Sequence, residues 1–116
     1  MSLRLGAVSF LNSRPLTTPL EEQTRDFDLV YAVPARCAAD LHSGAIDLGL
    51  IPAVEYVRGP CPYSIVPQVA VGCRGAVLTV RLFYRGELGA IRRLALDPSS
   101  RTSATLVRIL LKERYG

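Results

Sequence analysis

Hydrophobic and polar positions in the first half of the chain alternate between short apolar runs and amphipathic stretches. Apolar runs with the length of buried strands lie at residues 3–10, 27–33 and 48–51. A proline stands near the start of each amphipathic stretch that follows, and these prolines are Pro15, Pro34 and Pro52. The order strand, helix, strand, helix, strand, helix predicts an α/β fold, with parallel strands joined by right-handed crossovers and helices on the faces of the sheet.

Residues that start or stop helices bound the predicted helices of this half. The stretch at residues 34–42 is followed by Gly44, which is typical of a helix end. Pro19 limits the helix that Pro15 opens, so that helix should be short or irregular.

Apolar and β-branched residues dominate the region after residue 62. The runs at residues 63–72 and 76–84 predict two longer strands with a tight connection between them. Residues 88–91 should form a helical turn, and residues 93–96 one more strand. The apolar spacing at residues 102–114 predicts an amphipathic helix.

Composition places the chain among globular proteins. With 116 residues, 49% of them hydrophobic and 21% charged, it has the size of one domain or of one lobe of a two-lobed protein. It holds no apolar run near the roughly 20 residues of a membrane helix, and its start lacks the pattern of a secretory signal, so we expect a cytoplasmic protein with no membrane partner. Its three cysteines form no close pair, so neither a disulfide framework nor a zinc site is expected.

Basic residues concentrate in the second part of the chain. Residues 1–70 carry 5 basic and 7 acidic side chains, whereas residues 71–116 carry 9 basic and 3 acidic ones. Such a basic segment indicates an anionic partner. The arginines are spread over several elements, aromatic residues make up only 7%, and zinc-finger spacing is missing, so a small anion is favoured over nucleic acid.

Polar loops follow the carboxyl ends of predicted strands, the edge at which open α/β sheets bind ligands. The loop at residues 99–103 combines four hydroxyl side chains with Arg101 just before the last predicted helix. Free backbone N–H groups, hydroxyls and a guanidinium together suit a carboxylate or phosphate. The alternative is that one hydroxyl merely caps the helix, although capping does not need Arg101.

Other polar residues of these loops have both a chemical and a structural interpretation. Asn12 could orient a substrate, or simply cap a turn or helix. Glu55 could act as a general base if desolvated, but an acidic residue near a helix start often only complements the helix dipole. His42 has no partner by spacing and is interpreted as structural, and Cys73 beside Arg74 has no second histidine with which to form a catalytic pair.

Four segments in order resemble the chorismate dehydratase family of the futalosine route to menaquinone. They are RLGAVSFLNSRPL at residues 4–16, DLGLIPAVEY at residues 47–56, GCRG at residues 72–75 and ALDPSSRTS at residues 95–103. The resemblance extends over nearly the whole chain. Two positions depart from the family pattern, with Cys73 where serine is frequent and Pro98 where threonine is frequent.

The resemblance implies a type II periplasmic-binding-protein-like fold with the substrate in a cleft between two lobes. Residues 1–90 would form most of lobe one, with a βαβαβ core and two longer strands, and residues 91–116 would form the crossover strand and first helix of an incomplete lobe two. Family members are roughly twice this long, as two lobes require. Half a cleft cannot exclude water, so the chain alone is expected to be inactive.

The resemblance also implies a reaction, the loss of water from chorismate to give 3-[(1-carboxyvinyl)oxy]benzoate without a metal or other cofactor. Asn12 would be the catalytic residue. The residues expected to bind the dianionic substrate are Ser9, Arg14, Glu55, Cys73, Arg74, Ser100, Arg101, Thr102 and Ser103. Two alternatives of the same fold stay open, a non-catalytic binding module for small anions and the related cyclic dehypoxanthine futalosine synthase.

Overall fold

Strand β1 (Leu3–Ala7) is the centre of a three-stranded parallel sheet in the computed structural model, which describes residues 2–116. Strand β2 (Phe27–Tyr31) pairs with β1 along its whole length, and the short strand β3 (Leu48–Gly49) pairs on the other side. In register, Leu5 lies beside both Leu29 and Leu48. The predicted α/β character and parallel strands are confirmed.

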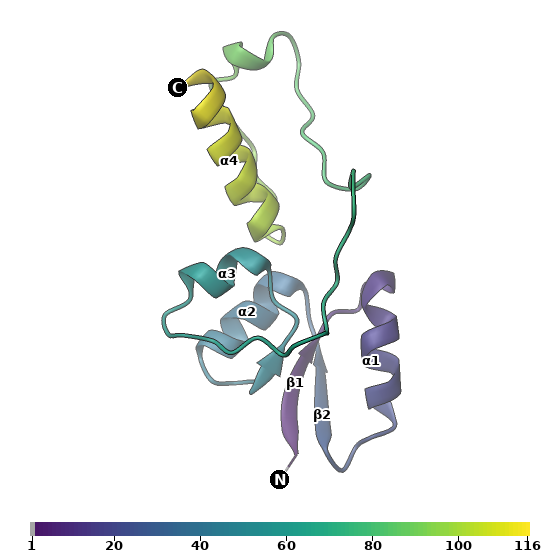
Figure 1. The fold of residues 1–116 in the computed structure, drawn as a ribbon. Helices are drawn as coiled ribbons and strands as arrows, with labels where there is room; N and C mark the ends of the chain where they lie inside the picture. Colours follow the sequence, from purple (N-terminus) through teal and green to yellow (C-terminus); the bar gives the residue numbers. More distant parts are fainter. Residues whose placement is uncertain (1) are drawn as a thin grey trace.

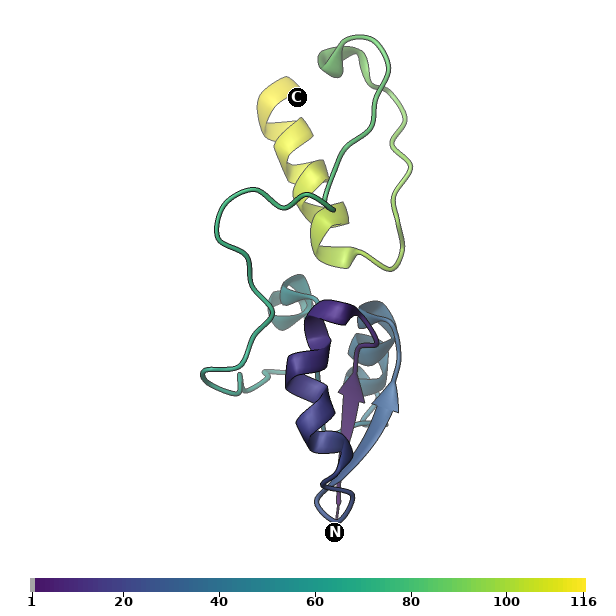
Figure 2. The same cartoon turned by 90° about the vertical axis from the view of Figure 1, so that its right-hand side faces the viewer.

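Helices lie on both sides of this sheet (Figures 1 and 2). A 3₁₀ turn, η1 (Leu11–Ser13), leads from β1 into helix α1 (Arg14–Glu21), which contacts β2. Helix α2 (Pro34–His42) packs on β1 and β3 from the other side. Helix α3 (Ala53–Arg58) follows β3 directly, as Pro52 led us to expect.

The core of the sheet lies between β1 and α2. Val8, Cys37 and Ile46 form its centre, and each is at most 4% exposed. Gly6 allows Cys37 of α2 and Ile46 to pack closely on β1, because a Cβ atom at this position would lie 2.5 Å from the Ile46 Cδ1 atom and 3.3 Å from the Cys37 Sγ atom. Burial raises the pKa of the Cys37 thiol above its usual value.

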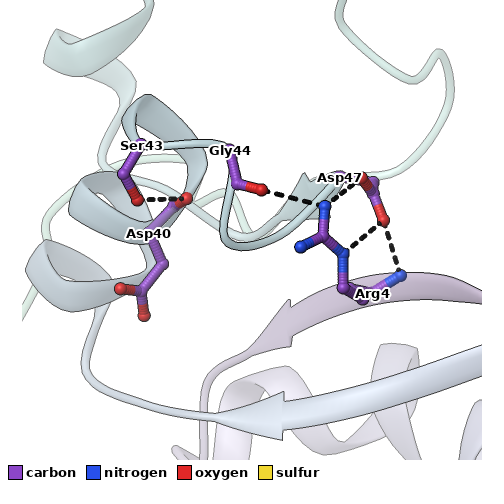
Figure 3. Close-up of polar contacts among 5 residues, drawn as sticks. All are labelled: Arg4, Asp40, Ser43, Gly44 and Asp47. Carbon is purple, nitrogen blue, oxygen red and sulfur yellow. Dashed lines mark hydrogen bonds and ion pairs between the residues drawn. The ribbon is translucent and has the colours of Figure 1, made fainter.

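An ion pair ties the central strand to the turn before β3 (Figure 3). The Arg4 guanidinium donates to both carboxylate oxygens of Asp47, at 2.7 and 3.0 Å, and to the Gly44 carbonyl at 2.9 Å. The backbone N–H of Arg4 also donates to Asp47, at 2.9 Å. Gly44 has a φ of 74°, the left-handed conformation that glycine adopts readily, so it can end α2 and turn its carbonyl towards Arg4.

The prediction of three strands after residue 62 is wrong. Residues 63–72, 76–84 and 93–96 contain no strand, and the chain runs through them as irregular extended backbone (Figures 1 and 2). Their apolar side chains are largely exposed, including Leu78 at 75% and Phe83 at 86%. A strand persists only when a neighbouring backbone supplies hydrogen bonds, and none of residues 2–116 pairs with these runs.

Two helical elements complete the chain. The short 3₁₀ turn η2 (Leu88–Ala90) lies where a helical turn was expected. Helix α4 (Arg101–Tyr115) confirms the last predicted helix, one residue longer at each end. It begins beside α3 and extends away from the sheet, which gives a long molecule of 55 × 29 × 22 Å (Figure 1). No helix in residues 2–116 is long and apolar enough to cross a membrane.

Candidate functional site

Helix α3 and the first turns of α4 meet through three polar contacts. Glu55 of α3 forms an ion pair with Arg101 of α4, with 3.2 Å between the Glu55 Oε2 atom and the Arg101 Nη1 atom. The backbone N–H of Val54 donates to the Thr102 hydroxyl at 3.3 Å. One turn further along α4, Arg58 Nη1 donates to the Thr105 hydroxyl, also at 3.3 Å. We call the three strands with helices α1, α2 and α3 (residues 3–58) the sheet unit. These contacts hold the SSRTS segment at residues 99–103 against the sheet unit through α3.

Glu55 is the buried charge of this junction. Only 4% of the residue is exposed, so its carboxylate depends on its protein partners for solvation. Besides Arg101, its Oε2 atom lies 3.7 Å from the His42 Nε2 atom at the end of α2. Glu55 thus connects three helices, and it does more than complement the dipole of its own helix.

His42 is a member of the junction that sequence reasoning missed. Its ring stacks on Tyr63, with 5.6 Å between ring centroids and an interplanar angle of 11°. The His42 Nε2 atom and the Tyr63 hydroxyl are buried, and neither has a hydrogen-bond partner in the described part of the chain. Desolvation raises the pKa of the Tyr63 phenol, and the Cys61 thiol adds to this shift. No local pattern could reveal this contact, because His42 ends α2 and Tyr63 lies in the irregular segment after α3.

An open cavity of about 450 Å³ lies beside the junction, between α3 and α4. Its charged lining consists of three arginines and two carboxylates, namely Arg58, Arg101, Arg108, Glu55 and Asp97. Asp97 accepts hydrogen bonds from the Ser99 backbone N–H at 2.9 Å and from the Ser99 hydroxyl at 2.7 Å, which lowers the pKa of its carboxyl. The cavity therefore contains ionised groups of both signs.

The hydroxyls around the start of α4 do not cap the helix. Ser100 is the N-cap residue, and its side chain makes no capping hydrogen bond. Thr102 uses its hydroxyl as an acceptor for α3 instead. The structural alternative for this loop, a simple hydroxyl cap, is therefore wrong, and the N-terminal backbone of α4 lacks a side-chain cap.

The predicted residues after β1 lie on a different part of the surface. Ser9 and Asn12 are exposed, and Asn12 Oδ1 has one weak contact at 3.5 Å, with the Ser13 hydroxyl. Arg14 begins α1 and pairs with Glu21 at the end of that helix, at 3.2 Å. None of these three residues lines the cavity beside Arg101.

Cys73 and Arg74 lie in the extended segment between the sheet unit and α4, and both are exposed. The Cys73 Sγ atom makes two long contacts, at 3.8 Å with the Ala76 carbonyl and at 4.0 Å with the Gly75 carbonyl. Of the predicted site residues, the structure brings together Glu55, Arg101 and Thr102. The meeting of Asn12, Arg14 and Arg74 with this group stays a prediction.

Within residues 2–116, His, Cys, Asp and Glu side chains form no group of three or more that could hold a metal ion.

Comparison with known proteins identifies the family. The family described as "Menaquinone biosynthesis" matches residues 3–116. A curated relative, "Chorismate dehydratase" of Thermus thermophilus, is 34% identical over 109 residues, which cover 94% of this chain and 40% of that protein. No solved structure matches the chain significantly. This chain, which spans less than half the length of its curated relative, belongs to the menaquinone biosynthesis family.

Proposed function

We propose that this protein takes part in menaquinone biosynthesis by dehydrating chorismate to 3-[(1-carboxyvinyl)oxy]benzoate. The observation that carries this proposal is the 34% identity, over 94% of the chain, to a protein named chorismate dehydratase. The family match over residues 3–116 supports the same pathway. The chain covers 40% of that relative, which supports the expectation that these 116 residues alone do not complete the reaction.

The proposed reaction is an elimination that balances without a redox partner. A ring C–H bond of chorismate breaks, the hydroxyl on the ring leaves, and the proton and hydroxide together form water. Two ring carbons gain a double bond, and the resulting aromatic ring drives the reaction. The substrate's own carboxylate is proposed as the proton acceptor, because the Glu55 carboxylate is engaged by Arg101.

The polar loops have distinct proposed roles in this reaction. Asn12 orients the ring or assists the departing hydroxyl, since an amide donates and accepts hydrogen bonds but does not titrate. Arg14 and Arg74 attract the carboxylates of the dianion, together with the start of α4 at residues 100–103. These groups act from two lobes of a type II periplasmic-binding-protein-like fold, whose closure excludes water from the reacting ring. The exposed Asn12 and Arg14 side chains support this assignment, because an interlobe cleft is open until it closes on its substrate.

The proposal is tested by following chorismate and its product by liquid chromatography with ultraviolet detection. The chain is assayed alone and joined to the part of the Thermus thermophilus protein that lies beyond the matched region. We expect turnover from the joined protein and none from the chain alone. Absence of turnover in a folded joined protein would contradict the proposed function.

Asn12→Ala in the joined protein tests the catalytic assignment. We expect turnover to fall by about 100-fold, the usual cost of losing one positioned donor in an active site. Gln23→Ala is the matched control, because it also removes an exposed amide. Unchanged turnover in Asn12→Ala would remove Asn12 from the mechanism.

A further inference from the structure

We infer that Arg58 and Arg108 form an anion-binding subsite in the cavity between α3 and α4, and that it takes a single carboxylate group. In the proposed function, on which the identity of this ligand rests, the carboxylate belongs to chorismate. Neither arginine stands in a motif of the sequence that suggested a site. The ion pairs at the α3–α4 junction are the basis for this subsite, because they show which cations are free to bind a ligand.

Arg101, the cation expected to hold the substrate, is already neutralised. Its Nη1 atom lies 3.2 Å from a Glu55 carboxylate that is only 4% exposed, so the partly exposed Arg101 guanidinium is the positive charge beside a carboxylate shielded from water. Drawing Arg101 onto a ligand would leave the buried Glu55 carboxylate unpaired, which is costly. A second anion near Glu55 would also meet its negative charge.

Arg58 and Arg108 are the cations of the cavity that have no acidic partner in the described part of the chain. Among the charged lining residues, three arginines face two carboxylates, so the cavity has one net positive charge. Hydrogen bonds from Ser99 lower the pKa of the Asp97 carboxyl and so favour its ionised form. A ligand group with one negative charge would complete the balance.

The geometry of the two helices brings these cations to the same cavity. Arg101, Thr105 and Arg108 follow one another at spacings of four and three residues, so they lie on one face of α4. Arg58 reaches that face from α3, because its Nη1 atom donates to the Thr105 hydroxyl. Thr105 is itself fixed by donating to the Arg101 carbonyl at 2.9 Å.

This arrangement leaves donors available for a ligand. The described contacts use one N–H group of Arg58, and a guanidinium carries five. Two guanidinium planes beside one cavity suit the planar, bidentate geometry of a carboxylate. The volume of about 450 Å³ admits such a group together with part of the ring that carries it.

The competing interpretation is that Arg58 only attaches α3 to α4. That role requires the Thr105 hydroxyl and does not involve Arg108. Thr105→Val removes the contact while keeping both arginines, so it separates attachment from ligand binding. Circular dichroism spectra of all variants check that the helices are retained.

The experiment measures binding of benzoate and of chorismate to the 116-residue chain by NMR titration. Benzoate supplies one carboxylate, and uncharged benzamide has nearly the same shape. We expect benzoate to bind and benzamide not to bind. Arg58→Gln and Arg108→Gln should each weaken benzoate binding by about tenfold, because each removes charge-assisted hydrogen bonds. Arg25→Gln, an equal charge change at an exposed residue outside the cavity, should leave binding unchanged. Thr105→Val, which releases Arg58 from Thr105 but keeps both charges, should weaken benzoate binding less than Arg58→Gln does.

The outcomes separate this inference from the proposed function. Equal benzoate affinity in Arg58→Gln, Arg108→Gln and the Arg25→Gln control overturns the subsite. If both arginine variants lose benzoate binding and also bind chorismate about tenfold more weakly, the inference holds for the substrate. If the joined protein turns over chorismate with an unchanged KM in both variants, the proposed function stands and the subsite for its substrate is wrong. If benzoate binding depends on both arginines but chorismate is neither bound nor turned over, the subsite stands and the proposed function fails.

Discussion

The carboxylate of Glu55 illustrates how one side chain can join elements that are far apart in the sequence. It is almost fully buried, and Arg101 and His42 provide the positive and polar surroundings that replace water. Arg101 belongs to α4, and His42 ends α2. The contact between the sheet unit and α4 therefore depends strongly on this one charge.

Glu55→Gln is expected to destabilise the protein. The amide has nearly the same shape, but it leaves the partly exposed Arg101 guanidinium without its counter-charge. We expect the free energy of unfolding to fall by about 1–3 kcal/mol, as measured by urea denaturation. Glu113→Gln, at an exposed position of α4, is the control and should have almost no effect. Equal urea midpoints in the two variants would show that the Glu55–Arg101 pair does not stabilise the fold.

Asp47 should make the stability of the sheet depend on pH in the acid range. Its hydrogen bonds with Arg4 lower the pKa of its carboxyl to about 2 in the folded protein, below the value of about 3.9 in an unfolded chain. Its stabilising contribution is thus complete above about pH 4 and is lost as the pH falls towards 2. Asp47→Asn should flatten the dependence of the urea midpoint on pH in this window. An unchanged profile in Asp47→Asn, matching that of the exposed control Asp26→Asn, would contradict the assignment.

Elements with local start and stop signals are those that the sequence predicted well. Helix α2 begins at Pro34 and ends at His42, as expected, because proline at its start and Gly44 after its end act through the adjacent backbone alone. The prediction of strands at residues 63–72 and 76–84 was wrong for the opposite reason. Their β-branched residues favour extended backbone, but a strand also needs a neighbouring strand, and a local pattern cannot supply one.

In the candidate site, too, local features were predictable from the sequence and long-range contacts were not. The sequence placed Arg101 and Thr102 at the start of a helix, and α4 begins at Arg101. The partners of these residues, Glu55 and Val54, lie more than 40 positions earlier in the chain, so their contact required the folded structure. His42 was missed because its neighbour Tyr63 lies in a segment that was expected to be a strand.

Pro19 interrupts the hydrogen bonding of α1 and offers a test of that helix. Proline inside a helix lacks the N–H group that would donate to the residue four positions earlier. We expect Pro19→Ala to raise the free energy of unfolding by about 1 kcal/mol, after the greater freedom of the unfolded chain is taken into account. Pro15→Ala is the matched control, because the first turn of a helix leaves its N–H groups unpaired and nothing is gained there. A loss of stability in Pro19→Ala would mean that α1 requires the bend that proline imposes.

The molecule combines a well-packed sheet unit with a long segment that makes few packing contacts. Leu5, Ala7, Val8, Cys37 and Ala38 are all at most 6% exposed around β1 and α2. In contrast, residues 64–81 are exposed throughout, although many are apolar. The segment connects the sheet unit to α4, which contacts α3. Stability is therefore expected to differ strongly along the chain.

Hydrogen–deuterium exchange should reveal this difference directly. We expect the amides of residues 64–84 to exchange at rates close to those of an unfolded peptide, because they lack a ladder of backbone hydrogen bonds. The amides of β1 and β2 should be protected to the level of global unfolding, since both strands take part in the central pairing. Equal protection in the two regions, measured by mass spectrometry on short peptides, would contradict this picture.

The unequal burial of the three cysteines gives the protein a built-in reporter. Cys61 and Cys73 are exposed, so a maleimide should label both within the reaction time of a free thiol. Cys37 is buried on the face of α2 that packs against β1, and its thiol has a raised pKa. In Cys61→Ser/Cys73→Ser the single remaining thiol, Cys37, can be alkylated only when α2 lifts from β1. The alkylation rate of that variant would then measure how often α2 separates from the central sheet.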